Sequence, residues 1–244
     1  MLLHEMGGTL ESWDRTLPIL AQSHQVLAYD WRGAGQSERI QGEVTISDHA
    51  GDLLALLDAR GLAGRAVIAG CAVGGAIAAA FAAAHRERVA GLVLMSPAMD
   101  IPSEVREDRL RNIARFLEGG MREAVDASLA GGYPERFRLD EARFASFRAR
   151  WLANDPESFA ATYRMLLDLQ IAPVLAALQC PVLAVGGDHD TVRPPDYVQE
   201  VARRIAGARF VRVPGGHHMP HQIPEIVAAL IADFAASAAV LEHG

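Results

Sequence analysis

The hydrophobic positions of the chain fall into two recurring patterns. Short runs of Val, Leu, Ile and Ala, bounded by Gly, Pro or charged residues, are typical of buried parallel strands, whereas apolar residues three or four positions apart indicate helices. The two patterns alternate along the chain. This alternation predicts an α/β fold, with a mostly parallel central sheet covered by helices on both faces. We expect strands at residues 26–29, 65–69, 92–95, 182–185 and 210–213.

Three helices can be placed against these strands. Residues 46–57 carry apolar side chains at helical spacing, and Gly61 follows as a stop signal. An alanine-rich helix should begin just after residue 71, and the last helix should begin near Pro224. Helices of this kind are the crossover connections that a parallel sheet needs.

The stretch from residue 101 to residue 178 breaks the alternation, because it shows helical patterns and no convincing strand. We therefore expect a helical cap over residues 101–178, inserted between core segments 1–100 and 179–244. The insertion holds eleven of the arginines and most of the aromatic residues. Those aromatics could line a pocket or pack a small helical core. The first residues read as the end of a strand, so an N-terminal hairpin is expected upstream.

Composition narrows the classes of function. The 244 residues are half apolar, which suits one α/β domain, and no apolar run reaches the roughly 20 residues of a membrane span. No signal peptide is visible, so we expect a cytoplasmic protein without membrane contact, and a homo-oligomer stays open as its assembly. The net charge of −7 gives no reason to expect nucleic acid. All 23 basic residues are Arg, which excludes chemistry that depends on Lys.

The candidate chemistry centres on residues 70–75, which read Gly-Cys-Ala-Val-Gly-Gly. They follow a predicted buried strand and open a helix, which is the setting of a nucleophile elbow. We expect Cys71 to be the nucleophile, with its thiol pKa lowered by the start of the helix. The alternative is a buried structural cysteine.

With this elbow, the chain resembles the α/β-hydrolase family, especially small capped members such as the 3-oxoadipate enol-lactonases. Four further segments carry the resemblance in chain order. Residues 2–8 look like the oxyanion-loop segment, and residues 30–37 look like the turn D-x-R-G-x-G-x-S. Residues 187–190 are similar to the loop of the catalytic acid, and residues 214–220 to the segment of the catalytic histidine. The resemblance implies the α/β-hydrolase fold and an enzyme that hydrolyses an ester, lactone or enol-lactone.

Two positions in these segments have a neighbour that competes for the same role. Asp188 competes with Asp190, and His217 competes with His218. The resemblance favours Asp190 and His218, because the family usually has Gly before its catalytic histidine and His217 stands at that position. A metal site at His217, His218 and His221 is the alternative, but the expected supporting ligands are missing nearby, so we expect no metal and no other cofactor.

The resemblance implies a mechanism with a covalent intermediate. His218 would take the proton of Cys71, Asp190 would orient the imidazole, and the thiolate would form an acyl-thioester with a small-molecule acyl substrate. The N–H groups of Met6 and Ala72 would hold the oxyanion. Alternatives that remain open are an acyltransferase, a thioesterase, a C–C bond hydrolase and a non-catalytic small-molecule receptor.

Position 5 departs from the capped relatives, which have Gly there. Dienelactone hydrolases have a Cys nucleophile together with a Glu in the oxyanion segment, and Glu5 and Cys71 match those positions. The resemblance therefore implies that Glu5 faces the thiol as an auxiliary base. The alternative is a solvated loop carboxylate.

Overall fold

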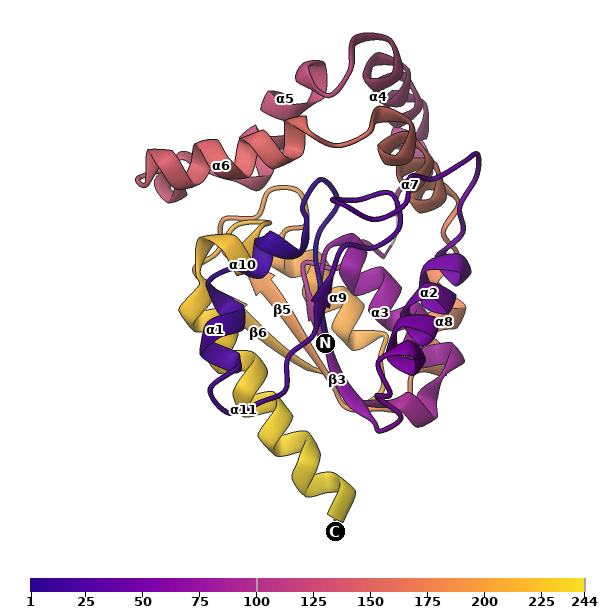
Figure 1. Cartoon of the computed structure of the whole chain (residues 1–244), viewed down its shortest axis with the longest axis vertical. Helices are drawn as coiled ribbons and strands as arrows, with labels where there is room; N and C mark the ends of the chain where they lie inside the picture. The colour runs from indigo at the N-terminus through magenta and orange to yellow at the C-terminus, as the bar shows by residue number, and fades with distance from the viewer. Residues whose placement is uncertain (100, 244) are drawn as a thin grey trace.

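The computed structural model describes residues 1–99 and 101–243. In this part of the chain six strands form one sheet in the order β2-β1-β3-β4-β5-β6 (Figure 1), and every neighbouring pair is parallel. Because the strands are parallel, their carboxyl ends meet at one edge, where α/β sheets bind ligands. The strands are β1 (Leu2–Leu3), β2 (Ala28–Tyr29), β3 (Ala66–Cys71), β4 (Val89–Met95), β5 (Val182–Gly187) and β6 (Arg209–Val213).

Helices cover both faces of the sheet, as the sequence pattern predicts (Figure 1). Alternate side chains of β4 point to opposite faces: Leu92 and Leu94 pack in one core cluster, and Val93 and Met95 pack in the other. The first cluster lies under α2 (Ile46–Ala59), α3 (Val73–Ala84) and α9 (Pro195–Arg203), and the second under α1 (Thr16–Leu20) and α11 (Pro224–His243).

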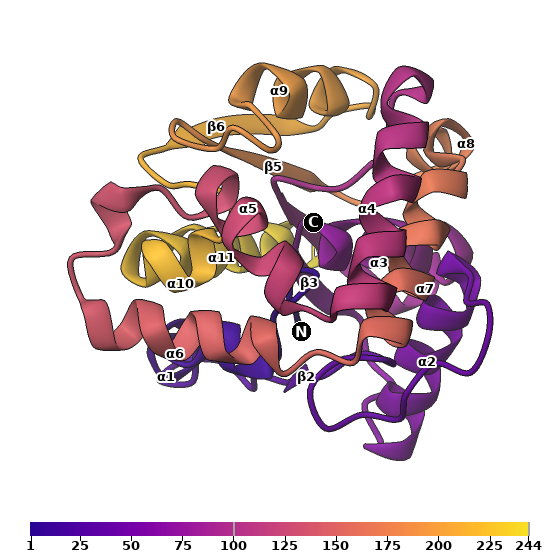
Figure 2. The ribbon, with the colours of Figure 1, turned by 90° about the horizontal axis from the view of Figure 1, so that it is seen from above.

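Between β4 and β5 the described residues form helices joined by turns and loops, and they contain no strand. Seen from above, all of these helices except the last lie over the sheet (Figure 2). The last of them, α8 (Ile171–Ala177), packs on α3 through Ile171 and Leu175, so it adds to the core of the sheet. The inserted helices are α4 (Arg106–Gly119), α5 (Arg122–Gly132), α6 (Glu141–Leu152), α7 (Pro156–Asp168) and α8 (Ile171–Ala177).

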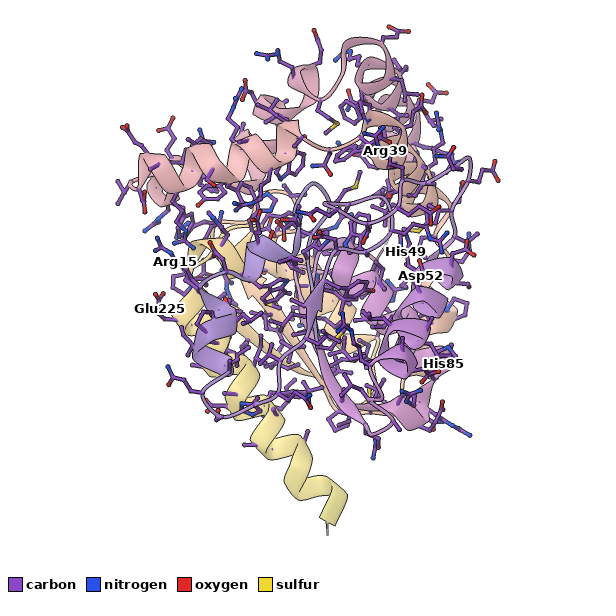
Figure 3. The ribbon with its side chains drawn as sticks, in the orientation of Figure 1. Arg15, Arg39, His49, Asp52, His85 and Glu225 are labelled. Carbon is purple, nitrogen blue, oxygen red and sulfur yellow. The ribbon has the colours of Figure 1, made fainter. Side chains whose placement is uncertain are left out.

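Two of the inserted helices begin at aspartates that also contact the core. Asp140 caps α6 and Asp155 caps α7, each by accepting a backbone N–H of the first turn. Arg15 lies 3.5 Å from Asp140 and Arg39 lies 3.4 Å from Asp155, and Figure 3 shows the two arginines on opposite sides of the molecule. Exposed ion pairs of this kind contribute about 1 kcal/mol or less, so they orient the inserted helices more than they stabilise them.

The predicted α/β-hydrolase architecture is confirmed, and the strands depart from expectation mainly at their ends. β3 continues to Cys71, two residues beyond its predicted end, which places that residue inside the strand. None of the described helices is both long enough and apolar enough to cross a membrane.

Candidate active site

The turn from β3 into α3 presents one side chain at the carboxyl edge of the sheet. Ala72 occupies this turn with φ 49° and ψ −112°, a conformation in which non-glycine residues are strained. Two glycines let α3 start this close to the sheet: a Cβ on Gly70 would collide with the carbonyl of Gly74, and a Cβ on Gly74 would collide with that of Leu3. The geometry is that of a nucleophile elbow, and Ala72 is its central residue.

The structure therefore contradicts the prediction that Cys71 is the nucleophile. As the last residue of β3, Cys71 points into the α11 side of the core, where it is fully buried, and it does not line the cavity. Its Sγ donates to the carbonyl of His217 at 3.3 Å. Burial and the carboxylates of Glu5 and Asp190 raise the thiol pKa well above its usual value, contrary to the lowering that we expected.

The sequence already contained the signal for this correction. In the pattern G-x-S-x-G the nucleophile stands midway between the two glycines. Gly70 and Gly74 have this spacing, and Ala72 is midway between them. The chain thus keeps the backbone of an elbow without a nucleophilic side chain on it.

Asp190 is the buried acid of the loop that follows β5. Its Oδ1 accepts the backbone N–H groups of Val192 and Arg193, each at 2.8 Å, and its Oδ2 lies 2.8 Å from Nδ1 of His217. Burial alone would raise the pKa of Asp190, but His217 and these hydrogen bonds outweigh it and lower the pKa. The competing Asp188 pairs at the surface with Arg212 at 2.8 Å, so the choice of Asp190 as the partner of a histidine agrees with the geometry.

The histidine that pairs with Asp190 is His217, not the expected His218. A histidine at position 217 places an imidazole within reach of Asp190, at a position where the resemblance leads one to expect Gly. His218 instead turns its Nδ1 toward Glu5, whose Oε1 lies 3.7 Å away. The site therefore contains two carboxylate–imidazole pairs, and the predicted pairing of His218 with Asp190 is wrong.

Glu5 faces inward, as the resemblance implies, but its nearest titratable partner is His218. The side chain is 1% exposed, and Oε1 accepts the hydroxyl of Ser12 at 2.8 Å. Burial alone would raise the pKa of Glu5, but the attraction of His218 and His4 outweighs it and lowers the pKa to about 2. Glu5 is therefore a buried carboxylate and not a solvated loop residue.

Aromatic side chains of the inserted segment surround His218. The ring centroids of Phe147, Trp151 and Tyr133 lie 4.9, 6.0 and 6.1 Å from that of the imidazole. Gly132 approaches so closely that an added Cβ would lie 2.7 Å from Nε2 of His218. Burial lowers the pKa of His218 more than Glu5 raises it, so the imidazole is neutral near pH 7.

Two backbone N–H groups near Ala72 are available to a ligand. Among the described residues, no oxygen accepts the N–H of Met6 or that of Val73. The N–H of Ala72, which we expected to hold the oxyanion, donates to the carbonyl of Met95 at 2.9 Å and is therefore not free. Val73, the residue after the elbow, replaces it as the candidate donor.

A cavity of about 440 Å³ lies between the sheet edge and the inserted helices. Ala72 and both imidazoles, His217 and His218, line it. Within the described part of the chain, no group of three or more His, Cys, Asp or Glu side chains is arranged to bind a metal. The aromatic residues divide between the two expected roles. Phe116, Trp151, Phe159 and Tyr163 line the cavity, whereas Phe144 and Phe147 pack among the inserted helices.

Comparison with known proteins agrees with this geometry. The family model described as the alpha/beta hydrolase fold matches residues 1–222. The chain belongs to the α/β-hydrolase family. As a member, it is an enzyme whose relatives include named hydrolases and esterases.

Three α/β-hydrolases illustrate the similarity. The chain is 30% identical to a putative carbamate hydrolase RutD of Azorhizobium caulinodans, over 87% of this chain and 81% of that protein. It is 30% identical to a thermophilic esterase from Thermogutta terrifontis, with a TM-score of 0.90 over 97% of this chain and 89% of the esterase. It is 28% identical to the enol-lactonase from Burkholderia xenovorans, with a TM-score of 0.89 over 96% and 90% of the two chains.

Proposed function

We propose that this α/β-hydrolase cleaves a small carboxylic ester or lactone by direct attack of water, without a covalent intermediate. The observation that carries the proposal is the 2.8 Å contact between His217 and Asp190 at a cavity whose elbow presents Ala72. An imidazole that is oriented by a buried carboxylate can act as a general base. With a methyl group at position 72, the attacking oxygen has to come from elsewhere, and water is the simplest source.

The residues of the site suit each step of such a reaction. Water bound against Ala72 attacks the carbonyl carbon while the second ring nitrogen of His217 takes one of its protons. Asp190 stabilises the imidazolium that forms, and the N–H groups of Met6 and Val73 stabilise the oxyanion. When the intermediate collapses, the C–O bond to the leaving group breaks and the proton passes from His217 to the leaving oxygen. The enzyme returns to its starting state.

The relatives support this substrate class. An esterase, an enol-lactonase and a putative carbamate hydrolase are among the proteins that the chain resembles over most of its length. Esters, lactones and carbamates share a carbonyl carbon bonded to a heteroatom. Acyl transfer to a second substrate is less well supported, because the elbow offers no side chain to carry an acyl group.

The test is a panel of chromogenic esters and lactones assayed with three proteins. We expect His217→Ala to lower kcat by about 100-fold or more, since positioned general bases typically contribute that much. Cys71→Ala should keep kcat within about threefold, because the thiol does not line the cavity. Loss of turnover in Cys71→Ala, together with an acyl adduct on Cys71 of the wild-type protein by mass spectrometry, would overturn the proposal.

A further inference from the structure

The arginines of α4 divide into two groups. Arg106 pairs with Asp168 at 2.6 Å, and Arg111 pairs with Asp108 and Glu107 of its own helix. Arg109 and Arg115 line the cavity, and no carboxylate among the described residues forms an ion pair with either. Carboxylates thus neutralise Arg106 and Arg111, which do not line the cavity, whereas no carboxylate of the described residues pairs with Arg109 or Arg115, which do.

A third guanidinium lines the cavity from the loop of the catalytic acid. Arg193 follows Asp190 by three residues and is half-buried, and its Nε is buried without a hydrogen-bond partner. Glu123 is the one carboxylate among the residues that line the described cavity. Since the whole chain carries a net charge of −7, this excess of positive charge is a local property of the cavity.

We infer that the cavity binds substrates that carry an anionic group away from the scissile carbonyl, and that Arg109 and Arg115 recognise this group. The position given to the reacting carbonyl rests on the proposed function, whereas the anion site rests only on the arginines that line the cavity. Guanidinium groups bind carboxylates and phosphates through paired hydrogen bonds, so both are candidate anions.

The location of Arg109 and Arg115 fits recognition of one end of a ligand. Both residues are exposed, and both also line a second hollow of about 370 Å³ that Arg111 shares. Arg109 and Arg115 therefore lie at the outer opening of the cavity, whereas Ala72, His217 and His218 line its inner wall. A cavity of this volume holds a small ligand. Such a ligand would reach Ala72 with its carbonyl and the α4 arginines with its anionic end.

Equilibrium binding tests the anion site without requiring turnover. Dicarboxylates from succinate to suberate are titrated by calorimetry, each beside the monocarboxylate of equal chain length. The proteins are the wild type, the double variant Arg109→Gln/Arg115→Gln and the matched control Arg111→Gln. At the best chain length we expect the dicarboxylate to bind about tenfold more tightly than the monocarboxylate, since a hydrogen bond to a charged group contributes about that much. The double variant should remove this preference, and the control should keep it.

Two outcomes would overturn the inference. The first is equal affinity for dicarboxylate and monocarboxylate at every length, and the second is a preference that survives in the double variant. Loss of the preference in Arg111→Gln alone would also count against it, because the anion would then bind in the outer hollow. A parallel titration with ω-phosphonocarboxylates identifies the preferred anion, and an arginine-dependent preference for either anion supports the site. If these titrations succeed while the ester panel fails, only the proposed reaction is wrong.

Discussion

The buried carboxylate of Glu5 leads to a prediction of how the free energy of unfolding depends on pH. Its pKa falls from an ordinary value of 4.5 to about 2 in the folded protein. A pKa that is lowered on folding stabilises the protein above the unfolded value, and this contribution disappears as the pH falls toward the folded value. Lowering from 4.5 to about 2 corresponds to about 3 kcal/mol. Because the charges of His218 and His4 produce the lowering, this contribution is present only where those imidazoles carry a proton, and it fades toward neutral pH. The side chain is 1% exposed, so solvent screening removes little of this energy.

Glu5→Gln isolates this contribution, because Gln resembles the protonated acid and can still accept the hydroxyl of Ser12. The free energy of unfolding is measured by urea denaturation of both proteins at a series of pH values. We expect the variant to be less stable by up to about 3 kcal/mol at the pH values above 4.5 at which His218 is still protonated, and the two curves to converge between about pH 4.5 and pH 2. A constant difference across that window, or a variant as stable as the wild type at every pH above 4.5, would show that folding does not favour the ionised form of Glu5.

Two further predictions concern the imidazoles. Asp190→Asn should lower kcat by about 100-fold or more while the fold persists by circular dichroism, because an amide facing Nδ1 of His217 favours the tautomer that cannot accept a proton; a loss of less than tenfold would show that this pair is not the base. Gly132→Ala should displace the ring of His218 and destabilise the protein by about 1–3 kcal/mol, since the added Cβ would lie 2.7 Å from Nε2. Gly131→Ala is its control, with its nearest contact at 3.2 Å, and equal effects of both substitutions would contradict the reasoning.

The sequence predicts the sheet and its helices well, because buried parallel strands are written as continuous apolar runs. Which residue occupies the elbow depends on the exact position at which β3 ends. Alternate side chains of a strand point to opposite faces, so extending β3 from residue 69 to Cys71 directs the thiol into the α11 side of the core. Ala72 then occupies the turn. An error of two residues in the end of a strand thus changed the inferred nucleophile, although the motif, the fold and the edge of the sheet were right.

The pairing of the histidines could not be predicted from motif order, because it depends on which imidazole the folded backbone brings within reach of each carboxylate. In Asp190, two backbone N–H groups occupy Oδ1 and Nδ1 of His217 occupies Oδ2. His217 thus fills the place on Asp190 that we expected His218 to take.

His218 is 2% exposed among aromatic rings, and a buried imidazole that gains a proton there needs an anion close by. Glu5 supplies that anion. The two pairs are therefore physically connected, because His217 lies against Asp190 and His218 turns toward Glu5 instead. The histidine that pairs with each acid therefore has to be assigned from the geometry of Glu5, Asp190, His217 and His218 together.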